Sequence, residues 1–118
     1  MGRLTLKILL FCLAYHPGIL SAKENNIVTA NYHVNGVCEQ CKARIEYAAY
    51  TRGVKFAEWN LDSRILTLKY DSSKTSADTV LKNIAKAGHD AESYVATDED
   101  YNKLPSCCRY RTIKKRDP

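Results

Sequence analysis

The sequence predicts an α+β fold with the element order βαββαβ, in which two helices cover one face of a four-stranded antiparallel sheet. Four segments alternate apolar and polar residues with a period of two, which is typical of strands with one buried face. Two other segments carry apolar residues three and four positions apart, which is typical of amphipathic helices. Packing both helices on one face of a single sheet buries all of these apolar positions.

The first strand and the first helix are separated by a glycine turn. The strand is expected at residues 28–34, and its apolar face consists of Val28, Ala30, Tyr32 and Val34. Gly36 then gives the backbone the freedom to turn. The helix is expected from Cys41 to Arg52, and its apolar stripe consists of Cys41, Ile45, Ala48 and Ala49. Gly53 follows the last turn, as a terminating glycine often does.

The next two strands are predicted to form a hairpin. Residues 54–61 and 66–70 both alternate, and a short polar turn at residues 62–64 joins them. The start of the first of these strands does not fit the alternation well, which predicts a β-bulge near Lys55.

The second helix and the fourth strand complete the pattern. Ser76 can cap the helix, because its hydroxyl can accept a hydrogen bond from a free backbone N–H. The apolar stripe that follows consists of Ala77, Val80, Leu81, Ile84 and Ala87. Gly88 ends this helix, and a weaker alternation at residues 90–95 predicts the fourth strand. The expected arrangement is a ferredoxin-like βαββαβ open-faced sandwich.

The first 22 residues have the layout of a secretory signal peptide. Two basic residues come first, an apolar run follows at residues 8–14, and small residues stand at Ser21 and Ala22. The apolar run is shorter than the roughly 20 residues that cross a bilayer. We therefore expect cleavage after Ala22, with Ser21 as the alternative position, and export of the remaining chain, either to a periplasm or out of the cell. The alternatives are a short buried helix or a membrane anchor, and Cys12 is part of this leader.

Residues 97–118 form a cysteine-containing, basic C-terminal tail beyond the expected domain at residues 23–96. Thr97 can cap one helical turn, and Pro105 would end it. The formal net charge of +5 falls to a mild +3 when the two basic residues of the leader are removed, and the basic excess lies mostly in this tail. Charge runs at a chain end are usually solvated. The charge therefore gives no reason to expect a nucleic-acid partner.

Four cysteines lie beyond the leader, in the two pairs Cys38/Cys41 and Cys107/Cys108. An exported protein meets an oxidising compartment in which cysteines pair. A disulfide that closes so few residues removes little chain entropy, and adjacent cysteines close only a strained ring. A chemical role of the four thiols therefore explains these residues better than structural cross-linking does.

The Cys38-Glu39-Gln40-Cys41 segment lies between the glycine turn and the first helix. Two thiols three positions apart can face one ion when the first lies in a loop and the second opens a helix. The free N–H groups at a helix start favour the thiolate form, which is the form that binds metal. Thiolates select soft ions, and two of them suit a low-coordination ion such as Cu(I), whereas closed zinc sites almost always take four ligands. The spacing alone also occurs in redox enzymes.

At this point the chain resembles the heavy-metal-associated domain family, which contains copper chaperones, N-terminal domains of metal pumps and the periplasmic mercury-binding protein. The similarity covers roughly residues 27–95. It is carried by Gly36-Val37-Cys38-Glu39-Gln40-Cys41, Ile45-Glu46, Gly53-Val54, Ala57-Glu58-Trp59-Asn60-Leu61, Leu66-Thr67-Leu68-Lys69-Tyr70-Asp71 and Ile84-Ala85-Lys86-Ala87-Gly88-His89. The resemblance implies the fold described above, and it implies that Cys38 and Cys41 are the metal ligands.

Two departures from the family pattern bear on the choice of metal. The family usually has Gly-Met-x-Cys, whereas this chain has Gly36-Val37-Cys38, which is one residue shorter. The family often has an aromatic residue or lysine at the position of His89. An imidazole there is either a third ligand, a pH-sensitive neighbour of the site, or an ordinary surface or loop histidine.

Cys107 and Cys108 exceed the two thiols of the family site. One hypothesis is that the tail folds back and adds one or both thiolates, which gives a three- or four-sulfur site, or that it holds a second ion. The alternative is a frayed tail with incidental thiols.

The function that these residues favour is transport of a soft metal ion without catalysis. Cu(I) is expected first, with Hg(II), Zn(II) and Cd(II) as alternatives. The expected partners are a membrane metal transporter or another metal carrier, and a metal-bridged homodimer is a further option. A thiol–disulfide oxidoreductase is the alternative function, although its usual thioredoxin-like strand order differs from the order read here. A third option is an interaction module that docks on a membrane pump.

Overall fold

The computed structural model describes residues 25–112. The predicted signal peptide and the last six residues of the chain lie outside this range. The described elements, in chain order, are β1 (Ile27–His33), α1 (Glu39–Ala49), β2 (Val54–Trp59), β3 (Ile65–Asp71), α2 (Ala77–Lys86), α3 (Asp98–Asn102) and the 3-10 helix η1 (Ser106–Cys108).

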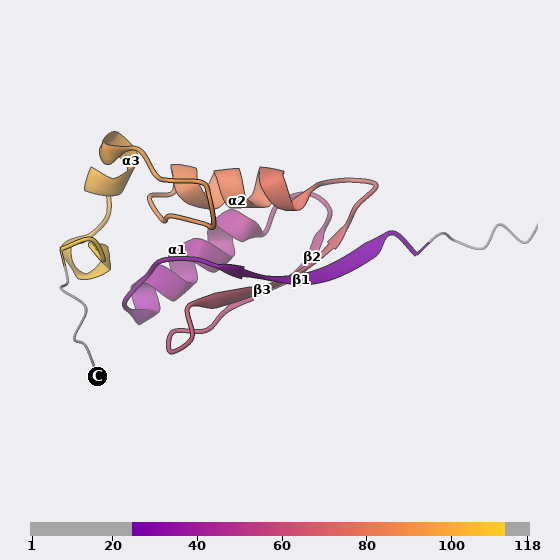
Figure 1. The fold of residues 1–118 in the computed structure, drawn as a ribbon, viewed down its shortest axis with the longest axis horizontal. Helices are drawn as coiled ribbons and strands as arrows, with labels where there is room; N and C mark the ends of the chain where they lie inside the picture. The colour runs from indigo at the N-terminus through magenta and orange to yellow at the C-terminus, as the bar shows by residue number, and fades with distance from the viewer. Residues whose placement is uncertain (1–24, 113–118) are drawn as a thin grey trace, which may run out of the picture.

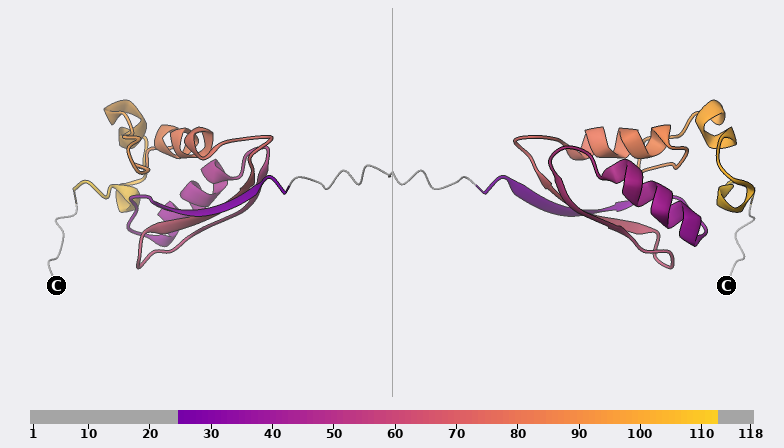
Figure 2. Two further views of the ribbon diagram at one scale, coloured as in Figure 1. Left: turned by 45° about the vertical axis from the view of Figure 1, so that its right-hand side comes forward. Right: turned by 180° about the vertical axis from the view of Figure 1, so that it is seen from behind.

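The sheet has the strand order β1-β3-β2, and both pairings are antiparallel. α1 and α2 lie together on one face of it, as Figure 1 and the two further views in Figure 2 show. The predicted α+β class and the two-helix layer are therefore confirmed. The predicted bulge is present too, because the β2–β3 register shifts between Val54 and Phe56.

The predicted fourth strand is wrong, since the described residues form a three-stranded sheet. Residues 90–95 make only two isolated bridges, Val34 with Ala91 and Ala91 with Tyr94. Glu92 has a φ of 49°, which is left-handed backbone that an extended strand does not contain. The backbone N–H of Glu92 donates to the His33 carbonyl, and the Glu92 carboxylate accepts from the His33 N–H at 2.6 Å. These contacts hold the segment as a tight turn at the end of β1.

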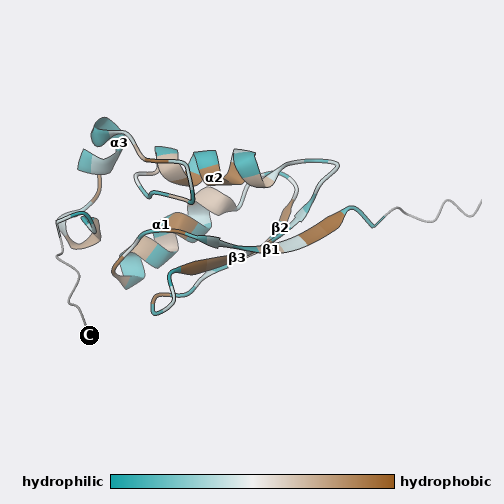
Figure 3. Cartoon of the chain, in the orientation of Figure 1, coloured by the Kyte–Doolittle hydropathy of each residue, from teal (hydrophilic) through white to brown (hydrophobic). Residues whose placement is uncertain are grey.

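The core lies between the sheet and the two helices. Its largest fully buried side chains include Trp59, Ile45, Leu66, Leu68 and Ile84. Figure 3 shows hydrophobic stretches on β3 and α2, which supply part of it. Trp59 is fixed by polar contacts as well, because its indole N–H donates to the Val34 carbonyl at 3.0 Å. Trp59 thereby joins β2 to the segment that leads into α1.

Both main helices begin with a side-chain cap. Ser76 caps α2 as predicted, with its hydroxyl accepting from the Thr79 N–H. α1 begins at Glu39, two residues before the predicted start, because Cys38 acts as its cap. α1 also ends earlier than predicted, at Ala49 rather than Arg52, where the chain turns through a Thr51 N–H bond to the Ala49 carbonyl.

The C-terminal tail is folded through Thr112. Thr97 caps α3 as predicted, with its hydroxyl accepting from the Asp100 N–H. The tail runs back to the end of the molecule at which α1 begins, and η1 contacts α1 (Figure 1). Within residues 25–112, no helix has both the length and the hydrophobicity that a membrane crossing requires.

Candidate metal centre

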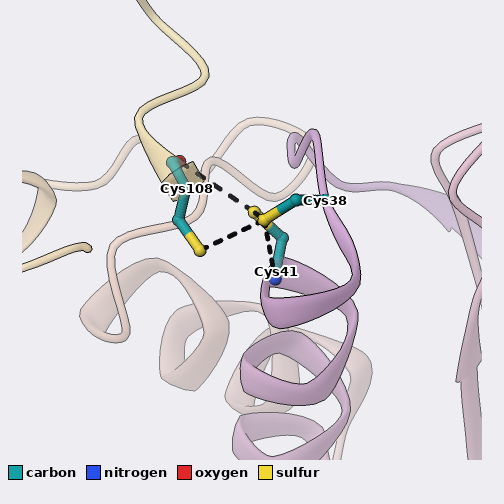
Figure 4. A group of neighbouring side chains, drawn as sticks. All are labelled: Cys38, Cys41 and Cys108. Carbon is teal, nitrogen blue, oxygen red and sulfur yellow. Dashed lines mark hydrogen bonds between the residues drawn. The ribbon is translucent and has the colours of Figure 1, made fainter. Parts of the chain in front are cut away.

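Three cysteine sulfurs meet at the start of α1 (Figure 4). The Sγ atoms of Cys38 and Cys41 are 3.2 Å apart, and the Sγ atoms of Cys38 and Cys108 are 3.5 Å apart. All three sulfurs lie within 4.8 Å of one another. Cys41 and Cys108 are fully buried, whereas Cys38 is partly exposed. The site therefore has a closed side and one side that a partner can approach.

The loop before α1 is shaped by close packing on Trp59. A side-chain carbon on Gly36 would lie 2.9 Å from the Trp59 ring and 3.0 Å from Cys41 Cβ, so only glycine fits there without a shift. Cys38 follows with extended backbone, φ −150° and ψ 170°, which is the usual conformation of a helix cap. The glycine, the buried ring and the cap together place Cys38 and Cys41 on the same side of the loop.

Backbone N–H groups point at two of the sulfurs. The Cys41 N–H donates to Cys38 Sγ at 3.4 Å, and the Val37 N–H donates to Cys41 Sγ at 3.4 Å. These donors and the positive end of the helix stabilise negative charge on sulfur. They stabilise the thiolate form that soft metal ions bind.

The three thiols differ in their pKa. Partial burial of Cys38 acts to raise its pKa, but hydrogen bonds from the Cys41 and Cys108 groups outweigh this and leave the pKa of Cys38 below its ordinary value. Burial raises the pKa of Cys41, and burial also raises the pKa of Cys108 strongly. Of these three thiols, Cys38 is thus the first to deprotonate. Cys41 and Cys108 lose their protons most readily when a metal ion binds to the sulfur in place of the proton.

Cys108 reaches the site because the tail is anchored on both sides of it. Before it, Leu104 is buried and packs over Gly88, where an added side-chain carbon would meet it at 2.9 Å. After it, the Tyr110 hydroxyl donates to the Gly88 carbonyl and accepts from the Asp90 N–H, both at 2.8 Å. The frayed-tail alternative is therefore wrong for residues 97–112.

Arg111 completes this anchor. Its guanidinium pairs with the Asp90 carboxylate at 2.8 Å and donates to the Ala96 carbonyl at 2.8 Å. It also lies 4.3 Å from the centre of the Tyr101 ring. The sequence interpretation treated this charge as part of a solvated basic run and missed the anchor. The signal that was available was the apolar spacing of Tyr101 and Leu104 just before the cysteines.

Cys107 lies outside the sulfur cluster. It is exposed, its thiol donates to the Gln40 side chain at 3.1 Å, and its Sγ is 3.9 Å from that of Cys108. Its predicted role as a ligand stays a prediction.

His89 is fully buried, so the interpretation of it as a surface histidine is wrong. Its Nδ1 lies 2.8 Å from the Asn35 carbonyl, and its ring stacks on Tyr110 with centroids 5.6 Å apart. The group of possible ligand atoms within 4.8 Å contains the three sulfurs and not this imidazole. Burial lowers the pKa of His89, because the protonated ring would lose its hydration. Its contacts make it a link between the site loop and the end of α2.

Comparisons with known proteins agree with this geometry. A model of the heavy-metal-associated domain matches residues 31–90 of the chain. The chain belongs to this family. The match contains Cys38 and Cys41, and the heavy-metal-associated domain therefore carries the CxxC part of the cluster, while Cys108 comes from outside the matched residues.

Individual relatives cover the same region. The chain is 41% identical over 66 residues to the copper-exporting P-type ATPase of Staphylococcus saprophyticus subsp. saprophyticus, a stretch that is 54% of this chain and 8% of the ATPase. The structure of the CopZ metallochaperone is similar, with 29% identity and a TM-score of 0.52, and the match covers 54% of this chain and 98% of CopZ. Oxidized MerP from Ralstonia metallidurans CH34 has 25% identity and a TM-score of 0.53, and the match covers 56% of this chain and 94% of MerP.

Proposed function

We propose that this heavy-metal-associated domain binds a soft metal ion, Cu(I) first, between Cys38 and Cys41 and carries, delivers or sequesters it outside the cytoplasm. The observation that carries the proposal is the pair of sulfurs 3.2 Å apart at the start of α1, each with a backbone N–H donor. Two soft ligands close together suit an ion that accepts few ligands. Hg(II), Zn(II) and Cd(II) are the competing ions.

The choice of Cu(I) is supported by the relatives. One is named as a copper-exporting P-type ATPase and another as a metallochaperone. Hg(II) stays a competitor because the family that the sequence resembles includes the periplasmic mercury-binding protein. Neither the domain nor the proposed transfer requires a catalytic step, so we propose a carrier rather than an enzyme. The partner that fits is a membrane metal transporter or another carrier, and a metal-bridged homodimer is a second assembly to be tested.

Delivery requires that the ion can leave. Cys38 is partly exposed while Cys41 is buried, so an incoming thiolate reaches the ion from the Cys38 side. The outside location rests on the leader-like residues 1–22, and periplasmic or secreted delivery is proposed on that basis.

Native mass spectrometry of the reduced chain with each of the four ions tests the proposal. A Cys12→Ser background removes the thiol of the leader and leaves the four described cysteines. We expect one Cu(I) per monomer at low ion concentration. In Cys38→Ser/Cys41→Ser we expect the affinity to fall about 1000-fold, which corresponds to about 4 kcal/mol. Unchanged stoichiometry and affinity in the double variant would contradict a site at Cys38 and Cys41.

The oxidoreductase alternative has one feature in its favour: the pKa of Cys38 is lowered from its ordinary value, whereas burial raises the pKa of the neighbouring Cys41. A thiol–disulfide oxidoreductase uses such an asymmetric pair for attack and resolution. Reduction of insulin disulfides by the purified chain measures this activity directly. We expect no turnover above that of the Cys38→Ser variant, and clear turnover would favour the enzyme.

A further inference from the structure

The tail holds Cys108 at the cluster through contacts that involve no metal. Leu104 packs on Gly88, Tyr110 bonds to Gly88 and Asp90, and Arg111 pairs with Asp90. Cys108 itself is fully buried between these anchors. Its sulfur is therefore held in place before any ion arrives, and little conformational freedom is lost when it binds one.

The separations of the sulfurs suit three ligands around one ion. A zinc–thiolate bond is about 2.3 Å long, and three sulfurs placed in a plane at that distance from one ion are about 4 Å apart. The sulfurs observed here are 3.2 Å and 3.5 Å apart in two pairs, and all lie within 4.8 Å. The sulfurs are therefore already close to the separations that three ligands of one ion require.

Cys107 makes a sharp contrast with its neighbour. Adjacent residues of η1 direct their side chains differently, so that Cys107 is exposed and bonds to Gln40 while Cys108 is buried against Cys38. The tail therefore delivers one sulfur to the cluster and leaves the other outside it.

We infer that Cys108 is the third ligand of the metal site, and that this chain holds a soft ion through the three sulfurs of Cys38, Cys41 and Cys108 within a single monomer. The inference rests on the proposed function, since it adds a ligand to the same site. An ion held by three sulfurs of one chain has no open position that a second copy must fill. The tail thereby occupies the position that a partner's thiolate would take, and delivery requires Cys108 to be displaced.

X-ray absorption spectroscopy of the Cu(I)-loaded chain counts the bound sulfurs and needs no variant. The matched variants are Cys108→Ser and Cys107→Ser, both in the Cys12→Ser background. We expect three sulfurs in the parent and in Cys107→Ser, and two in Cys108→Ser. A competing chelator measures the affinity, which we expect to fall at least roughly 10- to 100-fold in Cys108→Ser, since that is the loss typical when only a hydrogen-bond partner of a metal ligand is removed.

The other outcomes separate the claims. Two sulfurs in the parent, together with an unchanged affinity in Cys108→Ser, would overturn the third ligand and leave the Cys38/Cys41 site standing. Four sulfurs in the parent, or a loss in Cys107→Ser, would overturn the three-sulfur assignment in favour of both tail thiols. A parent that binds no Cu(I) would contradict the proposed function itself. Circular dichroism of Cys108→Ser and of Cys108→Ala checks that the buried substitution leaves the fold intact.

Discussion

The two main helices start in the same way but with different atoms. α2 begins at an exposed Ser76, whose hydroxyl accepts from the Thr79 N–H at 3.1 Å. α1 begins at Cys38, whose sulfur accepts from the Cys41 N–H at the longer distance of 3.4 Å. Serine is among the best helix caps, whereas sulfur is a weak hydrogen-bond acceptor. Helix capping alone therefore does not explain a cysteine at position 38, and we assign its thiol to the metal site.

What surrounds the two helix starts differs more than the caps do. The start of α2 is open to solvent, whereas that of α1 is enclosed by Gly36, the Trp59 ring and Cys108. A side-chain cap by itself only begins a helix. At α1 the enclosure, which consists of Gly36, the Trp59 ring and Cys108, turns a capped helix start into a site for an ion. The enclosure is also the part that substitutions damage most.

The largest expected effect comes from closing the space beside Gly36. In Gly36→Ala the new methyl would lie 2.9 Å from a fully buried, hydrogen-bonded Trp59 ring. Overpacking of this kind costs about 1–3 kcal/mol. We expect a loss of about 2 kcal/mol in the free energy of unfolding measured by urea denaturation, and weaker Cu(I) binding because Cys41 is displaced too.

A double-variant cycle assigns this loss to the enclosure. Trp59→Phe removes part of the ring that the methyl meets, so Gly36→Ala should cost less in that background. Equal costs in both backgrounds would show that the loop does not depend on the contact with Trp59.

The caps should separate stability from metal binding. Ser76→Ala removes an N-cap acceptor and should cost about 1 kcal/mol in the free energy of unfolding, with no change in Cu(I) affinity. Cys38→Ser keeps an acceptor at α1 and should leave the metal-free stability nearly unchanged while it disables the site. A stability loss in Cys38→Ser as large as that in Ser76→Ala would show that the sulfur has a structural role that we do not assign to it.

The smallest expected effect concerns His89, which links the site loop to the end of α2. Burial lowers its pKa, Arg44 lowers it further, and the Asn35 carbonyl and Asp90 oppose the shift, while Tyr110 stacks on the ring. Below an ordinary histidine pKa of about 6.5, the imidazole of residue 89 binds a proton in the unfolded chain but not in the folded chain. Stability contributed by His89 is therefore present above that pH and declines as the pH falls below it.

Urea denaturation of the metal-free chain at pH 7.5, 6.5 and 5.5 measures this decline. His89→Gln removes the titrating group and should flatten it, with the remaining histidines serving as the internal control. The same slope in both proteins would place the decline elsewhere in the molecule.

The elements set by local signals could be predicted, and those set by distant contacts could not. Ser76, the bulge at Lys55 and the cap at Thr97 were predicted from neighbouring residues alone. The turn at Glu92 could not be, because it depends on bonds to His33, which lies 59 positions away. In the site, Cys38 and Cys41 followed from spacing and position. Cys108 lies 70 positions from Cys38, and it reaches the site only through the contacts of the tail with Gly88 and Asp90.

The turn that stands in place of the predicted fourth strand also sets the position at which the C-terminal tail begins. The Ala96 N–H donates to the Asp90 carboxylate at 2.8 Å, so the chain is back at Asp90 after six residues. The same six residues in a strand would have reached about 20 Å along the sheet, at roughly 3.3 Å per residue. The same carboxylate then holds Arg111, so Asp90 closes two loops of the chain at one point. A strand at this position would carry the following residues toward the far end of β1. The 22-residue tail would then have to run back along the sheet before Cys108 could reach Cys38 and Cys41.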